Sequence, residues 1–127
     1  MKIEHIAIWT ENLDLLKDFY VKYLEGKSNQ KYREEDGFES YFITFESGAR
    51  LELMRRPPII PKQNIYDNFS GFTHLAFSVC SREKVDSLTN QLKSDGYEIL
   101  NNPRVTGDGY YESSFFDPDG NIIEITA

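Results

Sequence analysis

The sequence has little cysteine, little histidine and no long apolar run. Its one cysteine, Cys80, excludes an internal disulfide bond. The small and apolar neighbours of Cys80 in AFSVCS predict a buried core residue rather than a nucleophile. The stretch MKIEHIAIWTEN is too short and too charged for a secretory signal, and no segment approaches the roughly 20 apolar residues of a membrane span. We therefore expect a cytoplasmic protein with no membrane partner.

Basic residues are also scarce. Lysine and arginine total 14 against 21 aspartates and glutamates, which gives a net charge of -7 at pH 7, and the one adjacent basic pair is Arg55 and Arg56. Because nucleic-acid-binding proteins cluster basic side chains against the phosphates, we expect no nucleic acid partner. The 127 residues, 39% of them hydrophobic, suffice for one compact domain with a single core or two small cooperating cores.

The sequence repeats when it is shifted by about 69 residues. The shift lays the segment IEHIAI at 3–8 on the segment FTHLAF at 72–77. The chain has only two histidines, His5 and His74, and they coincide in this alignment. Both segments alternate or run apolar, which is typical of a largely buried strand. The two halves are therefore expected to begin with equivalent strands.

A helix is predicted after each of these strands. In the first half Asn12 can cap a helix that ends at Gly26, and in the second Ser81 can cap one that ends at Gly96. Apolar residues recur at helical spacing in both segments. They are Leu13, Leu16, Tyr20, Tyr23 and Leu24 in the first helix, and Val85, Leu88 and Leu92 in the second.

Strand-like segments follow each predicted helix. They are SYFITF and RLELM around the turn ESG in the first half, and ESSFF and NIIEIT around the turn DPDG in the second. Between the halves, RPPIIPKQNIYDNFSG carries three prolines and is typical of a connector. We expect one domain over 1–127, with a βαβββ module at 1–56, a connector at 57–71 and a second βαβββ module at 72–127. This is an α+β fold.

The last predicted strand of each module carries a glutamate among apolar neighbours, Glu52 and Glu124. A buried carboxylate needs a cation, a hydrogen-bond donor or a proton. One divalent ion would satisfy both glutamates and both histidines, and mixed imidazole and carboxylate ligands suit zinc, nickel, cobalt, manganese or ferrous iron. Two simpler readings stay open. Each histidine is also compatible with a satisfied core residue, and each glutamate with the solvent side of a half-exposed sheet.

This arrangement resembles the vicinal oxygen chelate superfamily, in which paired βαβββ modules form a cupped mixed sheet around a divalent metal. The segments FYVKYLEGK at 19–27 and FFDPDGNIIEI at 115–125 are similar to motifs of that superfamily. The chain looks most like small bacterial glyoxalase I (lactoylglutathione lyase), whose ligands come in the order histidine, glutamate, histidine, glutamate. The resemblance implies the glyoxalase/bleomycin resistance/dihydroxybiphenyl dioxygenase fold.

The same resemblance implies a ligand set and a reaction. The metal ligands would be His5, Glu52, His74 and Glu124, with Ni²⁺ the first choice and Zn²⁺ or Co²⁺ the alternatives. The lyase would isomerise the hemithioacetal of a 2-oxoaldehyde such as methylglyoxal and a thiol, through an enediolate. Glu124 would be the base that moves the proton, and Glu52 its counterpart across the metal. The partner would be this small-molecule substrate.

The quaternary structure that the resemblance implies is a homodimer with shared sites. Small glyoxalases of this kind bring their modules face to face between chains. The connector of some fifteen residues is also long enough for a cup built within one chain, at about 3.3 Å per extended residue. The sequence leaves intrachain and interchain assembly open.

Three positions depart from the pattern of glutathione-using bacterial enzymes. Trp9, Arg56 and Thr106 stand where those enzymes resemble one another in an arginine, an asparagine and a lysine. The thiol anchor is therefore missing or rebuilt, and Arg56 and Arg104 are candidates to rebuild it. Both arginines are also compatible with an ordinary solvated surface position. The thiol cosubstrate stays undetermined from the sequence.

Other members of the superfamily provide alternative functions. A bleomycin-type resistance protein would sequester a cationic drug without metal. Fosfomycin-resistance enzymes resemble a two-histidine, one-glutamate pattern, extradiol dioxygenases use ferrous iron in longer chains, and an epimerase typically has glutamine at the place of Glu52. The presence of Glu52 is the feature that separates the lyase from all four.

Overall fold

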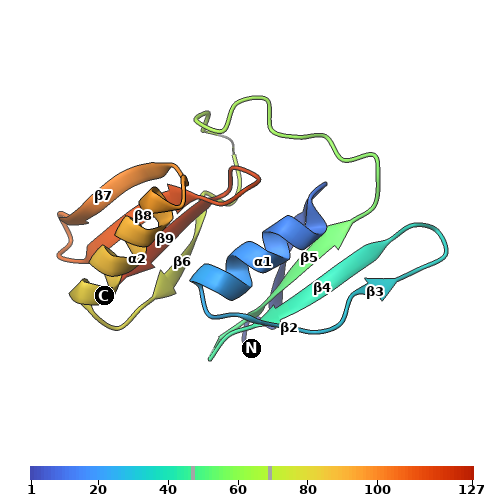
Figure 1. Ribbon diagram of the computed structural model, residues 1–127, viewed down its shortest axis with the longest axis horizontal. Coiled ribbons are helices and arrows are strands. Elements are labelled where there is room, and N and C mark those ends of the chain that lie inside the picture. Colours follow the sequence, from blue (N-terminus) through green and yellow to red (C-terminus); the bar gives the residue numbers. More distant parts are fainter. Residues whose placement is uncertain (47, 69) are drawn as a thin grey trace. The chain divides into compact units, whose positions relative to one another are not determined.

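The computed structural model describes residues 1–46, 48–68 and 70–127 (Figure 1). The predicted turn ESG includes Ser47, which lies outside the described residues.

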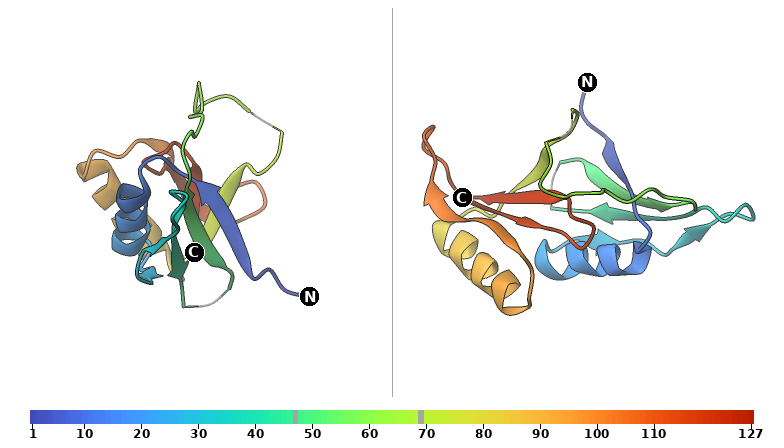
Figure 2. Two further views of the ribbon diagram at one scale, coloured as in Figure 1. Left: turned by 90° about the vertical axis from the view of Figure 1, so that its right-hand side faces the viewer. Right: turned by 90° about the horizontal axis from the view of Figure 1, so that it is seen from above.

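The chain forms two compact units, Met1–Pro61 and Lys62–Ala127. In the described part of each unit, one helix packs against one face of a mixed sheet (Figure 2). The chain is therefore an α+β protein, as the sequence predicts. The boundary between the units lies within the segment 57–71.

In the chain order of the first unit, one helix follows the first strand and precedes the other strands. Its elements are β1 (His5–Trp9), α1 (Leu13–Tyr23), β2 (Lys27–Ser28), β3 (Tyr32–Arg33), β4 (Glu39–Thr44) and β5 (Arg50–Arg55). The sheet order is β1-β5-β4-β2, with β3 also paired to β4. β1 runs parallel to β5, and the other pairs are antiparallel. The last strand of the unit thus lies beside the first.

The second unit repeats this plan. Its elements are β6 (His74–Ser78), α2 (Arg82–Ser94), β7 (Ile99–Val105), β8 (Tyr111–Phe116) and β9 (Ile122–Thr126). The order is β6-β9-β8-β7, and again the first strand runs parallel to the last. The first unit departs from it at one place, since two strands of two residues, β2 and β3, replace a long strand like β7. The intervening sequence KSNQKYREED is polar and lacks the apolar alternation that a long strand needs.

The helices pack as their spacing predicts. Every apolar residue named for them is buried, with Leu16, Tyr20, Val85 and Leu92 at 0% relative exposure. They meet apolar residues on one face of each sheet: Leu51 and Leu53 in β5, and Ile123 and Ile125 in β9. Full burial of such a side chain stabilises a fold by about 1.5–3 kcal/mol. The opposite face of each sheet is the one left for polar side chains.

The predicted helix ends need two corrections. Ser81 does cap α2, since its hydroxyl accepts a hydrogen bond from Lys84 N at 3.1 Å, whereas the side chain of Asn12 makes no cap bond to α1. The helix α1 ends at Tyr23 rather than at Gly26, and Glu25 takes the left-handed conformation with φ of 56°.

A glycine is needed at position 26 because the backbone packs closely against neighbouring residues there, and not because the chain reverses at the end of α1. A Cβ atom there would lie 2.4 Å from Ile43 Cγ2 and 3.1 Å from Tyr20 O. Only a residue without a side chain lets the chain pass so close to β4.

The prediction of a buried Cys80 is wrong. Cys80 is exposed and has a left-handed backbone with φ of 67°, at the corner between β6 and α2. Cys80 follows the end of β6 at Ser78 and has the parity of the exposed residues Ala76 and Ser78, not that of the half-buried Phe77 and Val79. The chain must turn there to begin α2 at its Ser81 cap.

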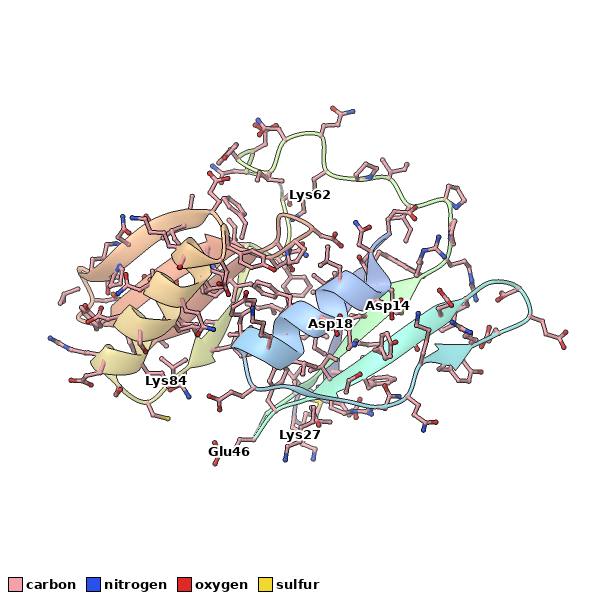
Figure 3. All side chains as sticks on the ribbon, viewed as in Figure 1. Asp14, Asp18, Lys27, Glu46, Lys62 and Lys84 are labelled. Carbon is pink, nitrogen blue, oxygen red and sulfur yellow. The ribbon has the colours of Figure 1, made fainter. Side chains whose placement is uncertain are left out.

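The first half of the connector is hydrogen-bonded to both units. On the first unit, Ile59 N donates a hydrogen bond of 3.0 Å to Glu11 Oε1. On the second, Lys62 Nζ donates to Gly120 O at 3.2 Å and to Asn121 Oδ1 at 3.0 Å; Figure 3 marks Lys62 on the connector. The DPDG turn therefore has a second role that its turn chemistry does not predict.

Two more connector side chains pack on the second unit. A Cβ atom at Gly120 would lie 2.3 Å from Ile65 Cγ2, so the glycine makes room for this isoleucine. The ring of Tyr66 meets that of Phe116 edge to face at 5.6 Å, and its hydroxyl bonds to Glu98. Among the described residues, no helix is long and apolar enough to cross a membrane.

Candidate functional site

The polar face of the first unit is defined by the register of β1 and β5. His5 is the partner of Arg50, and Ala7 is the partner of Glu52. Register partners, and residues two apart on a strand, share a face of a sheet. His5 and Glu52 therefore lie on the same face, and this face is opposite to the one that α1 covers through Leu51 and Leu53.

The two side chains approach each other on that face. His5 Nε2 lies 3.7 Å from Glu52 Oε2, with the side chains 42% and 16% exposed. The ring of Phe42, the register partner of Glu52 on β4, meets the imidazole edge to face at 5.8 Å. Glu52 is thus neither buried in the core nor on a fully solvated surface.

The second unit holds an equivalent pair in the same register. Ala76 is the partner of Glu124, and His74 Nε2 lies 3.9 Å from Glu124 Oε2. The side chains of His74 and Glu124 are 40% and 20% exposed. The repeat predicted from sequence therefore extends to side-chain geometry.

Each pair is compatible with two ligands of one metal ion. Ligand atoms about 2.0–2.2 Å from an ion are about 3.0–3.5 Å from each other. The observed separations of 3.7 and 3.9 Å exceed this by a few tenths of an ångström, which a side-chain rotation can supply. Neither unit gathers, among its described residues, a group of three or more ligand side chains. Each unit thus presents one histidine–glutamate pair, which is half of the ligand set that the sequence predicts.

Two residues beside His5 were missed by the sequence interpretation. Glu4 Oε2 is hydrogen-bonded to His5 Nδ1, and Glu4 Oε1 accepts a hydrogen bond from Arg50 Nη2. Arg50 also stacks over Phe42, with Cζ 4.2 Å from the ring centroid. The sequence signal was an acidic residue directly before the histidine, which has no counterpart at Thr73 in the second half.

Glu112 is a further carboxylate on the polar face of the second unit. It lies on β8 two residues before Ser114, the register partner of Glu124, so it shares the face of Glu124. Its side chain is 13% exposed. Burial and then the nearby charge of Glu124 raise the pKa of Glu112, against the opposing effect of Arg104. Side chains alternate between the two faces along YESSFF, and this alternation could have identified Glu112 from the sequence.

Trp9 and Arg56 occupy different surroundings in the first unit. Trp9 ends β1 on the face of His5 and is 51% exposed. Arg56 follows β5 and pairs with carboxylates of its own unit, 3.0 Å from Asp36 and 3.5 Å from Glu34. An anionic substrate would have to compete with these partners for the Arg56 guanidinium.

Arg104 and Thr106 lie at the end of β7 in the second unit. Arg104 Nη2 is 3.5 Å from Glu112 Oε1, and the two residues are register partners. The hydroxyl of Thr106 bonds to Asp108 and accepts a hydrogen bond of 3.1 Å from Tyr110 N, so it stabilises the β7–β8 turn. Arg104, unlike Thr106, therefore points to the face that carries the histidine–glutamate pair.

Comparison with known proteins identifies the fold and the family. The sequence pattern of the Glyoxalase/Bleomycin resistance protein/Dioxygenase superfamily matches residues 2–125. The chain belongs to this superfamily. The vicinal oxygen chelate resemblance inferred from the sequence is thereby confirmed, and superfamily members act on or bind small molecules.

Relatives within the superfamily cover the whole chain. The uncharacterized protein YqjT of Bacillus subtilis (strain 168) is 38% identical over 128 residues, which span 98% of each chain. The crystal structure of a glyoxalase family protein from Enterococcus faecalis is 27% identical, with a TM-score of 0.78 over 99% of this chain and 97% of that one.

A plant enzyme provides a more distant likeness within the superfamily. The structure of glyoxalase I from Zea mays has a TM-score of 0.79 and 23% identity, and it matches 98% of this chain. The match spans 44% of the maize chain. At this identity the likeness concerns the fold.

Proposed function

We propose that this protein is a cytoplasmic, metal-dependent lyase of the glyoxalase I type. Its substrate would be the hemithioacetal that a 2-oxoaldehyde forms with a thiol. The observation that carries the proposal is the pair of equivalent histidine–glutamate contacts, 3.7 Å in the first unit and 3.9 Å in the second, in the same strand register. Because the same arrangement occurs in both units, a common functional role explains the two contacts better than two unrelated surface interactions do.

The metal ligands we propose are His5, Glu52, His74 and Glu124. Imidazole and carboxylate donors suit a borderline divalent ion, with Ni²⁺ the first choice and Zn²⁺ or Co²⁺ the alternatives. When bound, the ion would act as a Lewis acid that stabilises the negative charge developing on the substrate oxygens. The family supports this reading, since some of its members with this fold are glyoxalase I enzymes.

The protein residues would then move the proton. The Glu124 carboxylate is placed to remove the hydrogen from the carbon that carries the hydroxyl and the sulfur, and to return it to the neighbouring carbonyl carbon. The hydroxyl proton moves to the neighbouring oxygen, so the product is a 2-hydroxy thioester and no oxidant is needed. Glu52 would hold the equivalent place across the metal.

The proposed assembly is a homodimer whose sites take ligands from both chains. Its support is that each unit presents one histidine–glutamate pair on a half-exposed face, so that two such faces together would supply all four donors. A shared site would complete the set and exclude water from the reacting carbons.

Metal analysis followed by a thiol panel tests the proposed function. Freshly purified protein is expected to contain about one divalent ion per chain. Methylglyoxal mixed in turn with glutathione, cysteine and other small thiols is expected to give thioester absorbance with at least one of them. Glu124→Gln should abolish turnover, whereas Glu35→Gln, in an exposed turn, should leave it unchanged.

Two outcomes would reject the proposal. Protein without a divalent ion that binds none when it is added, but that retains a cationic drug, would favour a bleomycin-type binding protein. A metal-loaded protein inactive with every thiol adduct would favour another metal-dependent member, such as a fosfomycin-resistance enzyme, an extradiol dioxygenase or an epimerase.

A further inference from the structure

The imidazole of His5 is contacted on both of its nitrogens. Nδ1 is hydrogen-bonded to Glu4 Oε2, and Nε2 faces Glu52 Oε2 at 3.7 Å. A separation of 3.7 Å is too long for a hydrogen bond. Of these two contacts of the His5 ring, only the one at Nδ1 is therefore a hydrogen bond. An ionised carboxylate can only accept, so Nδ1 is the donor in this bond, and a neutral ring then has its lone pair on Nε2.

The Glu4 carboxylate is itself held in place. Its other oxygen accepts a hydrogen bond from Arg50 Nη2, and Arg50 N donates a bond of 3.0 Å to Glu4 O. The Arg50 guanidinium lies over the ring of Phe42, with Cζ 4.2 Å from the ring centroid. Phe42 in turn meets the His5 ring at 5.8 Å. Glu4, Arg50 and Phe42 are thus linked to one another and to the imidazole by a continuous ring of contacts.

The second unit lacks each of these supports at the equivalent position. Thr73 stands in the place of Glu4, directly before His74. Ile122 is the register partner of His74, where Arg50 is the partner of His5. Ser114 is the register partner of Glu124, where Phe42 is the partner of Glu52. The two histidines are therefore equivalent in backbone position but not in their surroundings.

We propose that Glu4 is a positioning residue that fixes His5 in the Nδ1–H tautomer and makes its Nε2 the stronger metal donor of the two histidines. The part of this proposal that concerns metal rests on the proposed function. A carboxylate behind a ligating imidazole orients the ring and increases the electron density on the other nitrogen. Arg50 supports Glu4 through its hydrogen bond to Glu4 Oε1 and by compensating the charge of that carboxylate.

The tautomer can be measured in metal-free protein. Because the chain has two histidines, long-range ¹⁵N–¹H spectra resolve one ring in each unit. His5 is expected to show the Nδ1–H tautomer, and Glu4→Ala is expected to shift its population toward Nε2–H while the His74 signals stay in place. Thr73→Ala is the matched control and should change neither ring.

The metal affinity supplies the second measurement. Competition with a chromophoric chelator is expected to give Ni²⁺ or Zn²⁺ binding about 10- to 100-fold weaker for Glu4→Ala than for the natural protein, and unchanged for Thr73→Ala. Circular dichroism checks that the variants are folded. An Nε2–H tautomer of His5 in the natural protein, or a Glu4→Ala variant with unchanged tautomer and affinity, would overturn the proposal. If the natural protein binds no metal, the proposed function fails, and the tautomer measurement still decides the role of Glu4.

Discussion

Ala7 and Glu52 are register partners across the parallel strands β1 and β5. A small side chain thus lies directly beside the carboxylate on the polar face of the sheet. Ala76 has the same relationship to Glu124 in the second unit. Because both alanines are exposed, packing within the chain does not explain why the residue is small.

Enlarging this alanine should weaken metal binding without unfolding the protein. In Ala76→Val two methyl groups would crowd the carboxylate of Glu124, and we expect about tenfold weaker binding of Ni²⁺ or Zn²⁺, or about 1.4 kcal/mol. Stability should change little, since valine favours strands. Ser78→Val, one step further along the same face of β6, is the control and should bind normally. Equal losses in both variants would mean that bulk beside Glu124 has no special effect.

Mixing two inactive variants tests the shared site. A His5→Ala chain and a His74→Ala chain should each lose metal and activity while remaining folded, because the strands keep their apolar contacts. After subunit exchange, a heterodimer with interchain sites has one site with both lesions and one intact site. Recovery of about a quarter of the natural activity is expected from a random mixture. Absence of recovery after proven exchange, or an active monomer by light scattering, would exclude sharing between chains.

The ion pair of Asp14 should make the stability of the first unit depend on pH. Asp14 accepts hydrogen bonds of 2.7 Å from Lys31 Nζ and from the Tyr41 hydroxyl, and these two contacts lower the pKa of Asp14. A lowered pKa stabilises the folded state above the unfolded value of about 3.9 and ceases to do so as the pH falls through the folded value. Burial and the hydrogen bond to Asp14 raise the pKa of Tyr41 to about 12.

Urea unfolding of Asp14→Asn checks this dependence. Because the Asp14 side chain is 62% exposed, we expect a loss of only about 0.5 kcal/mol at pH 7 after screening by solvent, and none at about pH 2.5. Asp18→Asn, on the same helix (Figure 3), is the control and should show no comparable dependence. A loss for Asp14→Asn that persists at low pH would assign the effect to packing rather than charge.

Gly120→Ala should destabilise the second unit for two separable reasons. The residue has φ of 74°, and a Cβ atom would lie 2.3 Å from Ile65 Cγ2. We expect a loss of about 2–3 kcal/mol, of which about 1–2 kcal/mol comes from the backbone conformation.

Two further variants separate the backbone cost from the clash. In an Ile65→Ala background the cost of Gly120→Ala should fall to the backbone part. Gly109→Ala, with φ of 93° and nothing within 4 Å of its Cβ position, should show the backbone part alone. An undiminished cost in the Ile65→Ala background would show that the isoleucine is not in the way.

The repeat made most of the fold predictable from the sequence. The shift that aligned His5 with His74 also predicted two helices with their buried residues, because helical spacing and burial follow from the same periodicity. The end of α1 was predicted less well, since Gly26 is required by contact with Ile43 rather than by local chain reversal. Exposure of Cys80 was missed because its small and apolar neighbours were taken as a sign of burial, whereas Cys80 has the parity of the exposed Ala76 and Ser78.

The histidine–glutamate pairs were predictable as candidates, and the parity of YESSFF could also have indicated Glu112. Register is decided by pairing across strands, so Arg50 beside His5 appears only when the sheet is formed. The fastening of Lys62 and Ile65 to the DPDG turn depends on contacts between segments more than fifty residues apart. Local sequence carries no signal for such contacts.

The fastened connector acts as a much shorter tether than its length suggests. Glu11 holds Ile59, and the DPDG turn holds Lys62, so Ile60 and Pro61 lie between the two anchor points. Three peptide steps reach at most about 11 Å, against about 50 Å for fifteen extended residues. Any rearrangement in which the connector must span a longer distance requires one of these two contacts to break first. Loss of the Glu11 or Lys62 contact would therefore make such a rearrangement faster.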